Sequence, residues 1–233
     1  MAHGGEALNA GAGAEADLSE AAQERRAFAR WLFAQECRFV AGAATAEAVP
    51  AGSFPEIAFA GRSNVGKSSL VNALTARKTL ARVSITPGRT RQLNFFLLGE
   101  RLMLVDLPGY GYASASKSDI KAWTGLTRDY LKGRPGLRRM LLLVDSRHGL
   151  KQPDREMMKM LDEAAVSYQI VLTKSDKPKP AELERVRKDV AEEAARHVAA
   201  HPEIVATSAV TGAGIDELRA AVAGFAAGSE QRA

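Results

Sequence analysis

The stretch that most limits how this chain can fold is "GRSNVGKSS", residues 61–69. It matches the pattern G-x-x-x-x-G-K-[ST] at Gly61, Gly66, Lys67 and Ser68. The glycines let the backbone curl so that its N–H groups and the next helix face a phosphate, while the lysine reaches the β and γ phosphates and the serine can bind Mg²⁺. The apolar run "EIAFA" precedes the motif and the amphipathic "SLVNALTAR" follows it, so we predict a phosphate-binding loop between a strand and a helix.

Short apolar runs recur along the chain and alternate with longer segments of helical periodicity. These runs are "EIAFA", "RLMLVD", "RMLLLVD", "YQIVLT" and "EIVATS". Such runs are typical of strands buried on both faces, and the alternation predicts βαβ units around a mostly parallel sheet. The segment "RQLNFFLLGERLMLVD" instead predicts two strands joined by a tight turn at Gly99 and Glu100. We therefore expect a three-layer α/β fold of the P-loop NTPase class, with a six-stranded sheet that contains one antiparallel strand.

The two ends of the chain differ in composition from its body. Residues 1–25 are rich in Ala, Gly and Glu, which indicates a flexible leader. We expect a helix and a lead-in strand in residues 26–55, the α/β domain in residues 56–226, and a frayed C-terminus in residues 227–233. Neither a secretory signal nor a membrane-spanning run is evident, and the single cysteine, Cys37, fits a buried thiol in a reducing compartment. These features predict a cytoplasmic protein.

Charge is unevenly distributed along the chain. Residues 1–24 hold five acidic residues and no lysine or arginine, so the rest carries 32 basic and 22 acidic residues, a net charge of +10. This balance suits an anionic partner such as RNA. One basic cluster either faces RNA or forms a solvated rim; it consists of Lys132, Arg134, Arg138, Arg139, Arg147, His148 and Lys151. The four histidines lack the spacing of metal ligands.

A second motif, "DLPGYGYA", starts with Asp106 at the end of a predicted strand. Parallel sheets bind ligands at the carboxyl ends of their strands, where Asp106 can hold a water on Mg²⁺. Leu107 and Pro108 lead to Gly109, which has no side chain to keep its N–H from a terminal phosphate. The alternative is a Pro-Gly turn that only connects two elements.

The segment "TKSD", Thr173 to Asp176, follows the fifth predicted strand and indicates which base is bound. The Asp176 carboxylate can accept hydrogen bonds from N1–H and the exocyclic amine of guanine, whereas adenine lacks both donors. Lys174 can pack its stem along the base. Asn is more common than Thr at the first position, so a hydroxyl must take over one tether between loops. After the sixth strand, "TSAVTG" places Ser208 and Ala209 where they can donate to the guanine carbonyl.

The four motifs, in this order, resemble those of translation-factor-type P-loop GTPases. "GRSNVGKSS", "TPGRTRQLNFF" and "DLPGYGYA", with "TKSD" and "CRFVAGA", are similar to the EngB (YihA/YsxC) family of bacterial ribosome-biogenesis GTP-binding proteins, within the TrmE-Era-EngA-EngB-septin-like P-loop GTPases. The similarity runs from about Trp31 to Phe225 and implies a small, EngB-type G domain in residues 56–226. It further implies a role in assembly of the large ribosomal subunit, through rRNA or ribosomal proteins, and in normal cell division and septation.

The resemblance also implies roles for single residues. Thr90 would be the switch I threonine that joins Ser68 on Mg²⁺, with Asp106 acting through water, and Asn64 matches a position that helps to hold K⁺. The catalytic set would be Lys67, Thr90 and Gly109. The nucleotide-binding set would be Gly61, Arg62, Ser63, Asn64, Val65, Gly66, Lys67, Ser68, Gly88, Arg89, Thr90, Arg91, Gln92, Asp106, Leu107, Pro108, Gly109, Thr173, Lys174, Ser175, Asp176, Thr207, Ser208 and Ala209.

Tyr110 stands where the best-studied GTPases have a glutamine that orients the attacking water. A phenol cannot replace the carboxamide, so we expect slow hydrolysis that an assembly partner accelerates; alternatively, the ring simply packs beneath switch II. Arg89 and Arg91 are either arginine fingers in cis or, as we favour, solvated switch residues or phosphate contacts to RNA.

Three functions remain open from the sequence. The first is a GTP-hydrolysing assembly factor for the large ribosomal subunit. The second is a nucleotide-dependent scaffold at the division site with incidental hydrolysis, and the third is an ATP-using phosphotransferase. No heptad pattern argues for an oligomer, so we expect a monomer.

Overall fold

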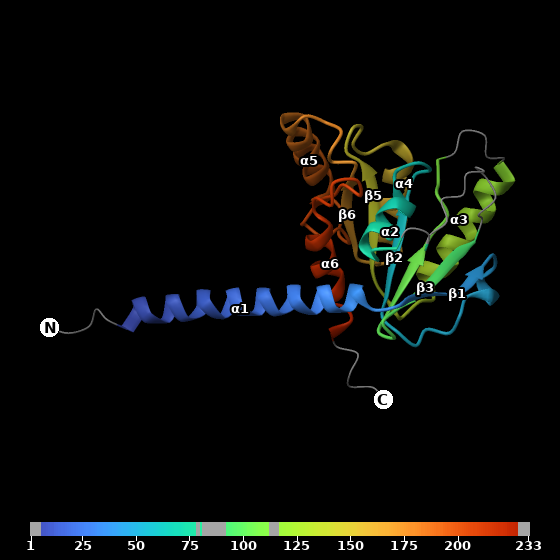
Figure 1. Ribbon diagram of the computed structural model, residues 1–233. Coiled ribbons are helices and arrows are strands. Elements are labelled where there is room, and N and C mark those ends of the chain that lie inside the picture. The colour runs from blue at the N-terminus through green and yellow to red at the C-terminus, as the bar shows by residue number, and fades with distance from the viewer. Residues whose placement is uncertain (1–5, 78–79, 81–91, 112–116, 228–233) are drawn as a thin grey trace.

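The computed structural model describes residues 6–77, 80, 92–111 and 117–227. In this part of the chain, seven strands form one sheet in the order β1-β3-β4-β2-β5-β6-β7 (Figure 1). The strands are β1 (Cys37–Ala43), β2 (Glu56–Gly61), β3 (Leu93–Leu98), β4 (Leu102–Asp106), β5 (Leu137–Asp145), β6 (Tyr168–Thr173) and β7 (Val205–Ala206). The helices are α1 (Glu6–Ala34), the 3-10 turn η1 (Ala46–Ala48), α2 (Lys67–Leu74), α3 (Lys117–Lys132), α4 (Gln152–Glu163), α5 (Pro180–Ala194) and α6 (Ile215–Ala223).

The sheet confirms the α/β class of P-loop NTPases, but it has seven strands rather than the six that the sequence predicts. The additional strand is β1, which contains the lead-in "CRFVAGA" and pairs antiparallel with β3. The strands β2, β4, β5, β6 and β7 pair in parallel, and β3 runs antiparallel to β4. The one antiparallel strand that we predicted is therefore β3. Gly99 and Glu100 form its turn to β4 with φ of 56° and 52°, the left-handed values that a tight hairpin needs.

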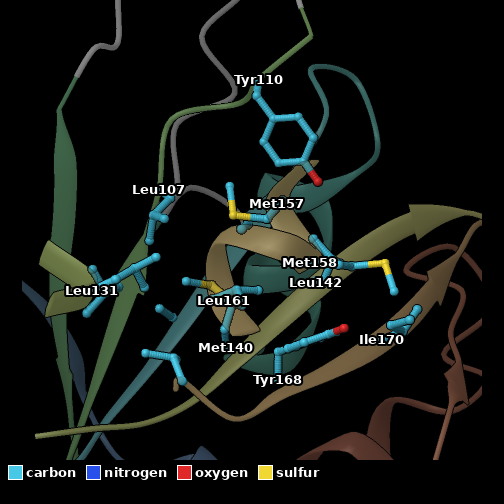
Figure 2. Packing of buried hydrophobic residues seen from close by; sticks show 14 of the residues in the cluster. Leu107, Tyr110, Leu131, Met140, Leu142, Met157, Met158, Leu161, Tyr168 and Ile170 are labelled. Carbon is cyan, nitrogen blue, oxygen red and sulfur yellow. The ribbon is translucent and has the colours of Figure 1, made fainter. Parts of the chain in front are cut away.

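Helices cover both faces of the sheet, which gives the three layers. One buried cluster joins the sheet to α1, α2 and α6, and the other joins it to α3, α4 and α5 (Figure 2). Along β2, Ile57 and Phe59 enter the first cluster, whereas Ala58 and Ala60 enter the second. All six residues of β2 are buried, which explains why this strand is apolar without alternation.

The N-terminal helix is longer than the sequence analysis predicts. We expected a flexible leader in residues 1–25, but α1 begins at Glu6 and continues to Ala34. Ala and Glu both have high helix propensity, so the composition that suggests a leader also fits a helix. The C-terminal part of α1 packs on α6 and buries Leu32 and Phe33.

Two expectations from composition can be compared with the described residues. Cys37 is buried at the start of β1, and burial raises the pKa of its thiol to about 12, which fits a structural role. Among the helices of the described ranges, none combines the length and the apolar character needed to cross a membrane.

A buried ion pair closes the end of the sheet at which β2 begins. Glu56 is 1% exposed and accepts hydrogen bonds from Arg134 Nε and from the Tyr130 hydroxyl, both at 2.9 Å. Arg134 also donates to the carbonyl of Pro50 at 2.7 Å. Each charged group thus has its partners within the protein, as a buried pair requires.

We expect Glu56→Ala to lower the free energy of unfolding by about 3 kcal/mol or more, because Arg134 would be left as an unpaired buried charge. Chemical denaturation measures this loss. The matched control is Arg38→Ala, which breaks the exposed pair between Arg38 and Glu100 and should cost less than about 1 kcal/mol. Equal losses in the two variants would contradict the prediction.

Candidate functional site

The predicted phosphate-binding loop connects β2 to α2. Its curl depends on left-handed backbone at Asn64, with φ of 64°, and at Gly66, with φ of 104°. A Cβ on Gly61 would lie 2.8 Å from a methyl group of Val65, so the loop folds back closely on its first glycine. The helix α2 begins at Lys67, which directs the helix N-terminus and the loop N–H groups to the same place.

The start of the "DLPG" segment lies against this loop. Asp106, the last residue of β4, is 9% exposed and forms an ion pair with Lys67. A Cβ on Gly109 would lie 3.2 Å from the Cα of Ser63, so any side chain here would be crowded against the phosphate-binding loop. The two motifs that the sequence assigns to the phosphates are therefore neighbours in space.

The loop after β6 is tied directly to the phosphate-binding loop. The hydroxyl of Thr173 donates to the carbonyl of Val65 at 2.6 Å, and the ammonium of Lys174 donates to the carbonyl of Asn64 at 2.7 Å. Thr173 is 3% exposed, so its hydrogen bond is shielded from water. The hydroxyl at this position thus serves as the tether that the sequence requires of it.

Asp145 is a residue of this region that the sequence analysis did not single out. It ends β5, between the ends of β2 and β6, and accepts hydrogen bonds from Lys174 at 2.9 Å and from Arg147 at 2.7 Å. Burial works against its charge, but these two partners hold the pKa of Asp145 well below its usual value. The sequence could have indicated Asp145, because the apolar run "RMLLLVD" ends in an aspartate just as "RLMLVD" ends in Asp106.

The predicted base-recognition residues also come together. Ser208 donates to the carboxylate of Asp176 at 2.7 Å, and the backbone N–H of Ser175 donates to the carbonyl of Thr207 at 3.0 Å. The hydrogen bond from Ser208, with a smaller contribution from Lys177, lowers the pKa of Asp176. Ala209 lies on the exposed side of this loop. Asp176 is therefore an oriented, ionised acceptor.

Tyr110 points into the protein. It is 6% exposed and belongs to the buried cluster drawn in Figure 2, and its hydroxyl donates to Asp154 of α4 at 2.9 Å. Its ring lies 5.5 Å from the ring of Trp123. Burial, together with the charge of Asp154, raises the pKa of Tyr110 well above its usual value, so the phenol remains a hydrogen-bond donor. The ring of Tyr110 is therefore packed inside the protein, which is compatible with the slow hydrolysis expected from the sequence.

The predicted nucleotide-binding residues 88–92 include four that the structure does not describe and one that contacts β1 and β3. Gly88, Arg89, Thr90 and Arg91 lie outside the described residues. The side chain of Gln92 donates to Asn94 at 3.0 Å and packs on Gly42 of β1.

The basic cluster that we considered as one RNA-facing surface is divided between the two ends of β5. Arg138 and Arg139 lie at the start of this strand, and Arg147 follows its end. Arg134 belongs to the buried pair with Glu56, and Arg139 packs on the ring of Phe225 at 4.9 Å. The cluster is therefore not one continuous basic surface.

Comparisons with known proteins identify the relatives of this chain. The family described as "50S ribosome-binding GTPase" matches residues 56–174, and the one described as "Elongation factor Tu GTP binding domain" matches residues 135–227. A "Probable GTP-binding protein EngB" of Rhodospirillum rubrum is 60% identical over 90% of this chain and 93% of its own length. The EngB protein of Caulobacter vibrioides is 52% identical over 89% of each chain.

Solved structures show the same fold at lower identity. The crystal structure of a probable GTP-binding protein EngB has a TM-score of 0.58 and 24% identity, over 70% of this chain and 94% of its own. Era of Aquifex aeolicus bound to GDP and AlF4⁻ also has a TM-score of 0.58, at 23% identity over 73% of this chain and 56% of its own.

The phosphate-binding loop, the acidic strand end beside it and the tethered "TKSD" loop define a P-loop GTPase, an enzyme that binds and hydrolyses GTP. They leave no support for an ATP-using phosphotransferase. The chain belongs to the EngB family of GTP-binding proteins.

We expect Thr173→Val to lower the affinities for GDP and for a non-hydrolysable GTP analogue by the same factor, about tenfold, because the buried carbonyl of Val65 would lose its donor. Calorimetric titration measures both affinities. Thr75→Val is the matched control, since Thr75 is 1% exposed and donates to the carbonyl of Val71 at 2.8 Å. A loss for only one nucleotide, or the same loss in the control, would contradict the prediction.

The lowered pKa of Asp145 predicts a pH dependence of stability. Its stabilising contribution is complete above the unfolded pKa of about 3.9 and is lost as the pH falls toward the lower folded value. In urea unfolding, the wild type should lose more stability between about pH 5 and about pH 2.5 than Asp145→Asn, by more than about 1 kcal/mol. Parallel pH profiles of the two proteins would show that the pairing is not coupled to folding.

Proposed function

We propose that this GTPase is a switch in the assembly of the large ribosomal subunit and is needed for normal cell division and septation. The observation that carries the proposal is the match of residues 56–174 to the family described as "50S ribosome-binding GTPase". The net charge of +10 after the first 24 residues suits an RNA-containing partner. In this proposal the protein acts in the cytoplasm as a monomer, with residues 56–226 as its G domain.

The nucleotide would lie across the carboxyl ends of β2, β5 and β6. The N–H groups of residues 61–68 would hold the α and β phosphates, with Lys67 at the β and γ phosphates. Gly109 would donate its N–H to the γ-phosphate, and Thr90 would close over the same group. Residues 173–176 and 207–209 would hold guanine, with Asp176 as its acceptor.

The donors near Lys67 fit a magnesium ion. The hydroxyl of Ser68 and the carboxylate of Asp106 are hard oxygen ligands, and the low exposure of Asp106 favours a paired charge there. Thr90 would add a second hydroxyl. When bound, Mg²⁺ neutralises charge on the β and γ phosphates. We also propose K⁺ beside Asn64, which a comparison of hydrolysis in potassium and sodium salts tests.

Hydrolysis by the protein alone should be slow. The side chain of Tyr110 is engaged with Asp154 and cannot orient a water, so the chain supplies positive charge and N–H donors without placing the nucleophile. Unaided GTPases that do have the glutamine turn over at about 10⁻⁴ to 10⁻³ per second. We infer that the assembly partner accelerates the reaction, which single-turnover hydrolysis with and without large-subunit precursors tests.

Asp176→Asn should change the base preference of the protein from guanine to xanthine nucleotides. The Asn amide can donate to the second carbonyl of xanthine, whereas guanine has its amine at this position. The affinity for guanine nucleotides should therefore fall by a factor of about 10² or more. Competition between GDP and XDP measures the change. Asp216→Asn, at an exposed carboxylate paired with Arg219, is the control and should keep the guanine preference. An unchanged preference in Asp176→Asn would contradict the role of Asp176.

Sedimentation with large-subunit particles tests the ribosomal role. We expect co-sedimentation with the GTP analogue, weaker binding with GDP, and a steep loss as salt rises if RNA is contacted. Nucleotide-independent binding or no binding would contradict the proposal. The alternative is a division-site scaffold with incidental hydrolysis; depletion would then disturb septation before any ribosome precursor accumulates.

A further inference from the structure

Three side chains from distant parts of the sequence meet behind the phosphate site. They are Arg62 of the phosphate-binding loop, Tyr110 after the "DLPG" turn, and Asp154 in the first turn of α4. The Tyr110 hydroxyl is 2.9 Å from Asp154 Oδ1, and Arg62 Nε is 3.3 Å from Asp154 Oδ2. Asp154 is fully buried and also accepts from the backbone N–H of Lys151 at 2.9 Å. Both oxygens of this carboxylate are therefore occupied, and its position is strongly determined.

The backbone at Tyr110 is joined to the phosphate-binding loop. The N–H of Ser63 donates to the carbonyl of Tyr110 at 2.8 Å, and the N–H of Tyr110 donates to the carbonyl of Gly61 at 3.3 Å. Arg62 and Tyr110 thus form a parallel β-bridge. This bridge holds Gly109, the preceding residue, against Ser63.

A second brace acts from α3. The indole N–H of Trp123 donates to the carbonyl of Pro108 at 3.2 Å, and its ring packs beside that of Tyr110. The residues on both sides of Gly109 are therefore held by side chains of other elements. A peptide held in this way loses less conformational freedom when it binds a ligand.

We propose that Asp154 is a positioning residue for GTP: through Tyr110 it holds the N–H of Gly109 at the place where the γ-phosphate arrives. The inference rests on the proposed role of Gly109 in meeting that phosphate. GDP has no γ-phosphate and gains nothing from this arrangement. The latch formed by Tyr110 and Asp154 therefore raises affinity for GTP relative to GDP, and it uses the position where other GTPases have their catalytic glutamine.

The test compares the affinities of GDP and a non-hydrolysable GTP analogue, in the presence of Mg²⁺, for Tyr110→Phe and Asp154→Asn. Tyr110→Phe removes a hydrogen bond to a charged acceptor and keeps the ring. We expect it to weaken analogue binding by about tenfold while GDP binding stays within about twofold. In the double variant, the losses of analogue affinity caused by the two substitutions should not add, because both substitutions remove the same hydrogen bond.

Tyr130→Phe is the matched control. Tyr130 is 4% exposed and donates to Glu56 at 2.9 Å, the same type of hydrogen bond as that of Tyr110, but it lies where β2 begins rather than where it ends. It should lower thermal stability to a similar extent and leave the ratio of the two affinities unchanged. An equal shift of this ratio in Tyr130→Phe would overturn the latch, since general loosening would then explain the effect.

Further outcomes separate the latch from the proposal on which it rests. Unchanged analogue affinity in Tyr110→Phe and Asp154→Asn, or equal losses for both nucleotides, would overturn the latch. Gly109→Ala tests the role of Gly109 by itself: a selective loss of analogue binding supports that role, even where the latch variants behave as wild type. Unchanged affinities for both nucleotides in Gly109→Ala would overturn the Gly109 role, and with it the mechanism that we propose for the latch.

Discussion

Two hydrogen bonds to backbone carbonyls hold the nucleotide site of this protein together. Thr173 reaches the carbonyl of Val65 and Lys174 that of Asn64, so the loop after β6 is fastened to the loop after β2. One strand, β5, lies between them, and its last residue, Asp145, pairs with the same lysine. The loop after β2 and the loop after β6 are therefore in direct contact across the carboxyl end of β5.

The sheet makes such a site possible because the carboxyl ends of its parallel strands lie side by side. The carboxyl ends of three of these strands carry buried polar side chains: Asp106 of β4, Asp145 of β5 and Thr173 of β6. At the opposite edge, the buried pair of Glu56 and Arg134 has only other protein groups as partners. At the carboxyl ends, Asp106 and Asp145 are also paired, but their partners Lys67 and Lys174 belong to the candidate site.

Several features depend on partners that are remote in sequence. β1 becomes the seventh strand because it pairs with β3, and the sequence "CRFVAGA" does not by itself reveal that partner. Asp154 lies 44 residues from Tyr110, and nothing in "QPDREMM" distinguishes it from a solvated first-turn acid. The basic residues around β5 look contiguous in sequence, although the last six residues of this strand, 140–145, lie between Arg139 and Arg147.

The sequence by itself determined the strand–loop–helix around Lys67, the order of the four motifs and the reversed strand β3, because each follows from local backbone chemistry and from apolar patterning. It also required a hydroxyl tether at Thr173. Only the tertiary structure decided that Tyr110 points into the protein, since that choice depends on a buried carboxylate from α4 and an indole from α3. Contacts of this kind are a property of packing between elements, which local sequence patterns do not encode.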